Sequence, residues 1–201
     1  MPNTVRRIPP PMTVEEFLVT DQVRFGRAWR YELVDGHPVA QSAPSPDHAA
    51  IVMNIGVALH SRLKGTPCRA ESGSAAIPRN KSKDRARIPD AMIRCNGIPK
   101  VLFEVSSPED DKRKVAKAER YNDLRNVEGV CEIVEIEQDE FLCRIHRWRA
   151  EISGWQLDYV SGMDAVLHLA SIGAHIPLAE LFDNVAVPES RAGETGAAAG
   201  D

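Results

Sequence analysis

The chain has 201 residues, of which 43% are hydrophobic and 27% are charged, and its formal net charge is −4. This composition is typical of a soluble protein with one core, and it excludes collagen-like and low-complexity chains. No apolar run approaches the roughly 18 residues that a membrane-spanning helix needs, so we expect no membrane partner. The acidic balance, with a pI of about 5.9, disfavours tight non-specific binding to nucleic acid, which usually needs a basic surface.

The two ends of the chain differ in composition from its central part. Residues 1–12 hold four prolines and predict a flexible N-terminal arm, and residues 186–201 are of low complexity and predict a disordered tail. Residues 13–185 show no internal repeat, which predicts one domain. The N-terminal arginines are not followed by an apolar stretch, so we expect no secretory signal and a cytoplasmic location.

The four cysteines have neither CxxC spacing nor histidines at the spacing of a zinc finger. Cysteines of cytoplasmic proteins are mostly kept reduced. We therefore expect partly buried thiols rather than a disulfide or zinc framework at Cys68, Cys95, Cys131 and Cys143.

The N-terminal part of the domain predicts a helix and a hairpin. Thr13 and Glu16 form a capping box, so a short helix should follow and carry Phe17 and Leu18 into the core. Residues 31–39 read as a strand, an Asp-Gly turn and a second strand. Glu32 in this first strand is either an outward-facing residue or a third acid of a functional site.

A long amphipathic helix should begin at Ser45, with Ser45 as N-cap and Pro46 as the first helical residue. Apolar residues then recur every four positions, up to about Lys64, which predicts a helix that faces the core. His48 lies in the first turn. Its side chain is expected to be solvated or bonded to the helix cap, with contact to a phosphate as the alternative.

The strongest functional signal lies between residues 87 and 105. Two apolar runs, 88–93 and 101–105, flank an Asn-Gly turn and predict a β-hairpin. Each run carries one acid, Asp90 in the first and Glu104 in the second. A hairpin centred on Gly97 would place these carboxylates opposite each other, with Cβ atoms roughly 4.5–5.5 Å apart.

Two opposed carboxylates in an apolar sheet repel each other, and both lose hydration. A divalent cation between Asp90 and Glu104 would offset both costs, and oxygen ligands on strands suit Mg²⁺ or Mn²⁺. The alternative is structural, because a slip of one residue would send one acid to the other face of the sheet. An Asp after a proline is also common in turns and at strand starts.

The remaining elements follow the alternation of apolar and polar residues. We expect a strand over residues 68–78, a mobile basic loop over 79–86 and a helix from about 107 to 125. Its residues Lys117 and Tyr121 should share one face. Further strands are predicted over residues 130–137, 141–148, 155–160 and 165–169, and a terminal helix over 176–182.

Two basic stretches lie close in sequence to the acidic hairpin. From them we take Arg85, Arg87 and Lys112 as candidate phosphate contacts. The alternative is that these side chains are only the solvated faces of a loop and a helix.

The order of several short motifs resembles that of the Uma-two family, restriction endonucleases within the PD-(D/E)XK nuclease superfamily. The resemblance covers about residues 13–185. It rests on segments that stand in the family's order and spacing: YELVDG (31–36), PSPDH (44–48), IPD (88–90), FEVSSP (103–108) and IPLAELF (176–182). It implies an α/β (α+β) fold with a restriction-endonuclease-like core, a mixed β-sheet flanked by helices.

The resemblance also implies roles for individual residues. Asp90 resembles the superfamily's metal-binding aspartate, and Glu104 resembles the acid of its (D/E)XK element. Glu32 matches the acid in the family's first strand. The superfamily's lysine would stand at position 106, where this chain has Ser106, and the family's helix lysine, matched here by Lys117, is thought to replace it.

Together these features predict a metal-dependent endonuclease that uses Mg²⁺ or Mn²⁺ to hydrolyse DNA or another nucleic acid. Asp90, Glu104 and Glu32 would hold the ion with the backbone carbonyl of Val105, and Lys117 would act on the water or the phosphate. Tyr121 and Ser106 would support the site. We also expect a homodimer, because cutting two antiparallel strands needs a two-fold arrangement.

Two alternatives remain open at the level of sequence. The first is a catalytically inactive protein of the nuclease fold that binds nucleic acid or a protein partner, which the acidic net charge and Ser106 favour. The second is a metal-dependent hydrolase of a smaller phosphate ester, which also fits the carboxylates. Lys117 itself has a structural alternative, a plain salt bridge to an acid.

Overall fold

The computed structural model describes residues 10–26, 28, 30–81, 83–107 and 114–188. Its centre is a six-stranded sheet in the order β3-β4-β5-β6-β7-β8, in which β5 and β6 are parallel and the other neighbours are antiparallel. The predicted mixed sheet flanked by helices is confirmed. The strands are β3 (Cys68–Glu71), β4 (Ala91–Cys95), β5 (Ile98–Ser106), β6 (Glu132–Glu137), β7 (Leu142–Arg149) and β8 (Gly154–Ser161).

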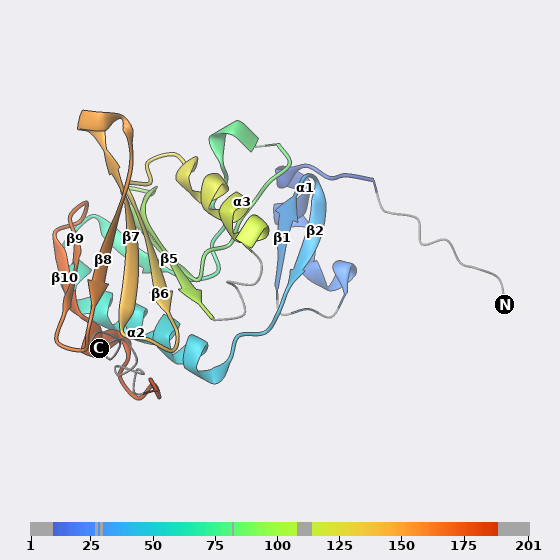
Figure 1. Ribbon diagram of the computed structural model, residues 1–201. Coiled ribbons are helices and arrows are strands. Elements are labelled where there is room, and N and C mark those ends of the chain that lie inside the picture. Colours follow the sequence, from blue (N-terminus) through green and yellow to red (C-terminus); the bar gives the residue numbers. More distant parts are fainter. Residues whose placement is uncertain (1–9, 27, 29, 82, 108–113, 189–201) are drawn as a thin grey trace, which may run out of the picture.

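Two helices cover the two faces of this sheet. Figure 1 shows α3 (Lys114–Arg125) beside one face, together with the hairpin of β1 (Arg30–Val34) and β2 (His37–Gln41). Helix α2 (Pro46–Leu63) runs along the opposite face. Because β5 and β6 are parallel, their connection must cross over the sheet, and α3 is that crossover.

Shorter elements complete the fold. A second two-stranded sheet, β9 (Val166–Leu169) with β10 (Ala174–Pro177), packs against α2 and leads into α4 (Leu178–Leu181). None of the helices in the described residues is both long and apolar enough to cross a membrane. The other short helices are α1 (Val14–Val19), η1 (Gln22–Phe25), η2 (Arg79–Lys81) and η4 (Ala150–Ile152).

Strand β5 separates two apolar cores. Val101, Phe103 and Val105 point to the α2 side, where they join the larger core built with β9, β10 and α4. Leu102 points to the α3 side and joins the smaller core. Because side chains alternate along a strand, Glu104 shares the α3 side with Leu102.

The helix starts agree with the sequence. The N–H of Thr13 donates to Glu16 Oε2 (2.7 Å), and the N–H of Glu16 donates back to Thr13 Oγ1 (3.2 Å), which is the predicted capping box. Ser45 caps α2 by accepting from the N–H of His48 (3.1 Å). Phe17 is buried as predicted, but Leu18 is 53% exposed, so its predicted place in the core is wrong.

Three boundaries differ from the predictions. Strand β3 ends at Glu71 rather than near residue 78. The loop predicted over residues 79–86 contains η2, and Ala86 exchanges two backbone hydrogen bonds with Leu33 (3.0 Å each). Residues 174–177 form β10 because they pair with β9, so the terminal helix begins only at Leu178.

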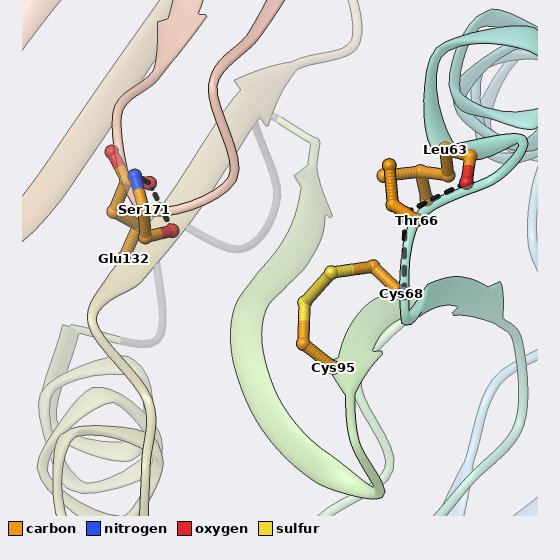
Figure 2. Close-up of a disulfide and its surroundings, with 6 residues drawn as sticks. All are labelled: Leu63, Thr66, Cys68, Cys95, Glu132 and Ser171. Carbon is orange, nitrogen blue, oxygen red and sulfur yellow. Dashed lines mark hydrogen bonds between the residues drawn. A yellow bond between two sulfur atoms is a disulfide. The ribbon is translucent and has the colours of Figure 1, made fainter.

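The prediction of four thiols is wrong for two of them. Cys68 and Cys95 form a disulfide between β3 and β4, where they stand directly opposite each other. Figure 2 shows how the end of α2 leads into this bridge: Thr66 donates to the Leu63 carbonyl and accepts from the N–H of Cys68. The spacing in sequence gave no sign of this pairing, because it arises from the register of two strands.

Candidate active site

The β4–β5 hairpin brings the two predicted acids together. Ala91 pairs with Phe103, so the next positions outward are Asp90 and Glu104, as the sequence predicted. Asp90 forms hydrogen bonds with the two residues that flank Glu104 in the sequence, Phe103 and Val105. Its N–H donates to the Phe103 carbonyl (3.1 Å), and its Oδ2 accepts from the N–H of Val105 (2.9 Å).

A β-bulge in the hairpin produces this register. Asn96 and Gly97 both have positive φ (51° and 79°), as a two-residue type I′ turn requires. Next to this turn, Arg94 pairs with Pro99, but the next residue of β4, Ile93, pairs with Val101. Lys100 is therefore the extra, unpaired residue of the bulge in β5. Without it, the partners of Ala91, Met92 and Ile93 would shift by one position, and the α3-side residues of this part of β4 would face the α2-side residues of β5.

Glu32 completes a group of three acids. It lies in β1, its side chain is fully buried, and its Oε1 accepts from the N–H of Ile88 (2.7 Å). Arg87 donates to the other oxygen, Oε2 (3.2 Å). Of the two sequence alternatives for Glu32, the structure therefore excludes an outward-facing residue.

Arg120 of α3 lies between two of these acids. Its Nε and Nη2 form a two-pronged contact with Glu104, at 3.0 Å to each oxygen. Its Nη1 donates to both oxygens of Glu32 (2.5 and 2.6 Å), and Nη2 also donates to the Ile88 carbonyl (3.1 Å). One guanidinium therefore ties α3 to β1 and β5.

Asp90 has different cationic neighbours. Its Oδ1 accepts from Arg30 Nη2 (2.9 Å) and lies 3.3 Å from Nε2 of His48. His48 thus contacts the site from the first turn of α2, whereas the sequence analysis expected it to be solvated or bonded to the cap. In this arrangement Asp90 is paired with Arg30 and Glu104 with Arg120, so a cation shared by the two acids would have to displace these contacts.

The pKa values of the three acids differ strongly. Burial acts to raise the pKa of Asp90, but His48, the N–H of Val105 and Arg30 lower it to about 2. Burial raises the pKa of Glu104 to about 7 against the effect of Arg120, and the charges of Asp90 and Glu32 add to this rise. For Glu32, Arg120 and its other donors outweigh burial and lower the pKa. Glu104 therefore holds a proton close to neutral pH.

Lys117 lies in α3 and forms an ion pair with Glu135 of β6. Ser106 Oγ donates to the same carboxylate (2.8 Å). Glu135 is the partner of Glu104 in the parallel β5–β6 pair, so the two acids lie side by side on the sheet. Tyr121 is buried nearby, and burial together with the charge of Glu135 raises its pKa well above 10.

The predicted phosphate contacts are not supported by the geometry. Arg85 and Arg87 are buried, and both donate to the buried carboxylate of Asp123 (2.9 and 2.8 Å). Arg85 also binds Asp35 (2.7 Å). These arginines brace the contact between the N-terminal hairpin and α3. Lys112 lies outside the described residues.

Several residues of this cluster are not evident from the sequence. Arg120 stands three positions after Lys117, a spacing that places both on one side of a helix and that could have been used. Arg30 and Glu135 carried no such signal. Their contacts join elements that are far apart in the chain.

The donor chemistry of the three acids fits a divalent cation, because Mg²⁺ and Mn²⁺ prefer carboxylate oxygens. Burial is the largest cause of the raised pKa of Glu104, and the charges of Asp90 and Glu32 add to it, so a cation bound there would favour the ionised form. In the part of the chain that the structure describes, however, no three His, Cys, Asp or Glu side chains are arranged as a metal site. A cation bound at Glu104 would have to replace its contact with Arg120.

The fold is an α/β fold with a mixed sheet flanked by helices, and comparison with known proteins identifies its family. The model of the Uma2 (Uma-two) family, described as "putative restriction endonuclease", matches residues 14–172, so the chain belongs to this family. A crystal structure described as a putative nuclease belonging to DUF820, from Anabaena variabilis, is similar in fold, with a TM-score of 0.65 and 20% identity. The similarity covers 86% of this chain and 98% of that one. The search of curated proteins gives no match.

Proposed function

We propose that this protein is a metal-dependent endonuclease that hydrolyses phosphodiester bonds of DNA. One observation carries the proposal: Glu32, Asp90 and Glu104, from separate parts of the chain, meet at one buried place. Membership of a family described as restriction endonucleases supports the nuclease class.

Asp90, Glu104 and Glu32 would hold one Mg²⁺ or Mn²⁺, with the backbone carbonyl of Val105 as a further oxygen ligand. When bound, the ion polarises a phosphoryl oxygen and lowers the pKa of a bound water. Asp90 is ionised at neutral pH, and the N–H of Val105 and the histidine of α2 fix its carboxylate.

Burial raises the pKa of Glu104 to about 7 in the metal-free protein, and Glu104 would bind the ion in its ionised form. The other side chains act on the phosphate. Lys117 supplies positive charge for the phosphate as negative charge develops there. Ser106 and Tyr121 support this lysine through Glu135, which contacts Ser106 directly and influences Tyr121 through its charge.

DNA is the proposed partner, and Lys112 remains a proposed phosphate contact. A homodimer is part of the proposal, because two antiparallel strands present their phosphates with two-fold symmetry. We also place the activity in the cytoplasm, as the sequence led us to expect.

The test is cleavage of plasmid DNA by purified protein with Mg²⁺ or Mn²⁺. We expect cutting by the wild type and its loss in Asp90→Asn and Glu104→Gln. Glu180→Gln is the matched control, because Glu180 pairs with Arg62 on the α2 side and lies outside the acid cluster. Equal cutting by the wild type and both acid variants would indicate a contaminant and overturn the proposal.

A second candidate is a nuclease-fold protein that binds nucleic acid or a protein partner without cutting. The observation in its favour is that Arg30 and Arg120 already neutralise Asp90 and Glu104. This candidate predicts a retarded band in a gel shift with duplex DNA, or capture of a protein partner, with no product over hours in either metal. Cleavage that depends on both acids would exclude it.

A further inference from the structure

Glu135 is a buried acid that the proposed reaction does not use directly. It lies in β6, its residue is 3% exposed, and it faces α3 beside Glu104 of the neighbouring strand. Burial acts against its charge, but Lys117 and Ser106 outweigh burial and lower its pKa, so Glu135 is ionised at neutral pH. A buried charge of this kind is costly unless its partners are fixed.

The partners of Glu135 come from three elements. Lys117 of α3 and the hydroxyl of Ser106 of β5 both bond its Oε1. Arg144 of β7 lies 3.5 Å from the same oxygen and makes a closer ion pair with Glu137. Removing the charge of Glu135 would therefore leave Arg144 its ion pair with Glu137, whereas the ion pair between Lys117 and Glu135 would be lost.

The two contacts of α3 with the sheet have different roles. Arg120 holds Glu104 on β5, and Lys117, one helical turn earlier, holds Glu135 on β6. Ser106 occupies the strand position at which a lysine of the (D/E)XK element would stand. Because Ser106 and Lys117 bond the same oxygen of Glu135, the ammonium group of Lys117 lies close to position 106 of β5.

We propose that Glu135 is a positioning residue that holds the ammonium group of Lys117 next to the Glu104 strand, in the place of the missing strand lysine. This inference rests on the proposed nuclease function. A lysine side chain has four rotatable bonds and loses much freedom when it is held in one place. Glu135 fixes the lysine side chain before substrate binds, so the loss of conformational entropy does not add to the barrier of the reaction.

The first test measures cleavage kinetics with an oligonucleotide duplex and Mn²⁺. Glu135→Gln keeps an acceptor for Ser106 but loses the charge, and we expect kcat to fall by about 10-fold to 100-fold with KM within about twofold. Glu137→Gln is the matched control, because this acid is on the same strand and the same face but pairs with Arg144. It should keep kcat within about twofold.

A double variant separates positioning from a general loss of stability. Lys117→Met should lower kcat, and adding Glu135→Gln to it should have no further effect, because the residue that Glu135 positions is gone. Additive losses, or a lower thermal midpoint in Glu135→Gln with unchanged kcat, would show that the ion pair is only structural and would overturn the inference.

The second test does not depend on activity. Lysine side chains are labelled briefly with an amine-reactive ester, and the label on Lys117 is measured by mass spectrometry. We expect at least about fivefold faster labelling in Glu135→Gln than in the wild type and in Glu137→Gln, because the amine of Lys117 is no longer held against the Glu135 carboxylate. Unchanged labelling overturns the positioning role even in an active enzyme. Absence of cleavage by the wild type, with the expected labelling, overturns the proposed function and the catalytic part of this inference but leaves the contact itself established.

Discussion

The two faces of the central sheet are built from the same strands but differ in chemistry. On the α2 side, β5 contributes Val101, Phe103 and Val105 to a large apolar core that α2, α4 and the β9–β10 sheet cover. On the α3 side, the alternate positions include Glu104, which pairs with Arg120 of α3, and Ser106, which bonds the acid that pairs with Lys117 of α3. One face therefore stabilises the fold by burial of a large apolar surface, and the other combines a smaller apolar core with paired charges.

This difference indicates that the α3 side of the sheet, and not the α2 side, carries the functional groups. Buried ion pairs contribute little net stability, since the loss of hydration offsets much of the attraction. The α3 side is therefore costly to maintain, and a structural role alone gives no reason for three acids at one place. The account predicts that truncations on the α2 side affect stability, whereas replacing an acid on the α3 side by its amide affects function first.

The largest expected effect contrasts one residue from each side. Glu104→Gln should lower DNA cleavage by about 10³-fold, because it removes a proposed ion ligand, with only a modest change in thermal midpoint. Leu59→Ala in α2 should lower the free energy of unfolding by about 2–5 kcal/mol and leave kcat of the folded protein unchanged. Urea unfolding and plasmid cleavage on both variants check this. Loss of activity in proportion to loss of stability in both would contradict the division.

Arg120→Met tests the compensation of charge on the α3 side. It leaves Glu32 and Glu104 buried without their shared cation, so we expect a loss of about 3–5 kcal/mol in the free energy of unfolding at pH 8. Arg62→Met is the control, since Arg62 pairs with the half-exposed Glu180 and should cost less than about 1 kcal/mol. Addition of Mn²⁺ should recover part of the loss in Arg120→Met. No recovery would argue against a cation site at these acids.

Reduction of the disulfide tests the α2 side alone, because Cys68 and Cys95 pack against the larger apolar core on that side. Reduction should lower the free energy of unfolding by about 3 kcal/mol, since the bridge restricts the unfolded chain. Urea unfolding with and without dithiothreitol measures this, and a Cys68→Ser/Cys95→Ser variant should show no response to the reductant. Cleavage by the reduced, folded protein should be unchanged. A loss of cleavage on reduction would link the two sides and weaken the comparison.

The smallest expected effect is a dependence of stability on pH. Folded Glu104 keeps its proton up to about pH 7, whereas the ordinary pKa of the group is 4.5. The unfolded chain therefore releases this proton first, and the contribution of Glu104 to stability falls as pH rises from about 4.5 to 7 and is constant above. The size is about 2 kcal/mol, from about 1.4 kcal/mol per pKa unit with allowance for relaxation.

Comparison of the wild type with Glu104→Gln measures this pH-dependent contribution of Glu104 to stability. The difference in free energy of unfolding between Glu104→Gln and the wild type should increase over the same pH interval. Buried His146, whose pKa burial lowers to about 4, acts in the opposite direction below pH 6.5 and is common to both proteins. A difference that does not vary between pH 5 and 7 would show that Glu104 is ionised throughout.

Features set by a few neighbouring residues were predicted well from the sequence. The Thr13 capping box, the Ser45 cap and the Asn96-Gly97 turn each depend on a hydrogen bond or a backbone angle within four residues. The opposition of Asp90 and Glu104 was also predicted, although the bulge at Lys100 that produces it was not.

Features that depend on distant parts of the chain were missed. The sequence places Arg85 in a basic loop, but its acidic partners, Asp35 and Asp123, come from the β1–β2 turn and from α3. Strand β10 forms because β9 pairs with it, and the disulfide forms because β3 and β4 stand in register. Arg120 was counted only as one of several basic residues, because a sequence does not show which side chain of a helix reaches a buried acid.

Calorimetric titration of the folded, metal-free protein with Mn²⁺ tests the central claim most directly. The account predicts one ion bound per chain, loss of that binding in Asp90→Asn and Glu104→Gln, and tighter binding in Arg120→Met, where no guanidinium competes for Glu104. A wild-type protein that binds no Mn²⁺ although it is folded, or one whose binding is the same in all three variants, would contradict a shared cation site at these acids.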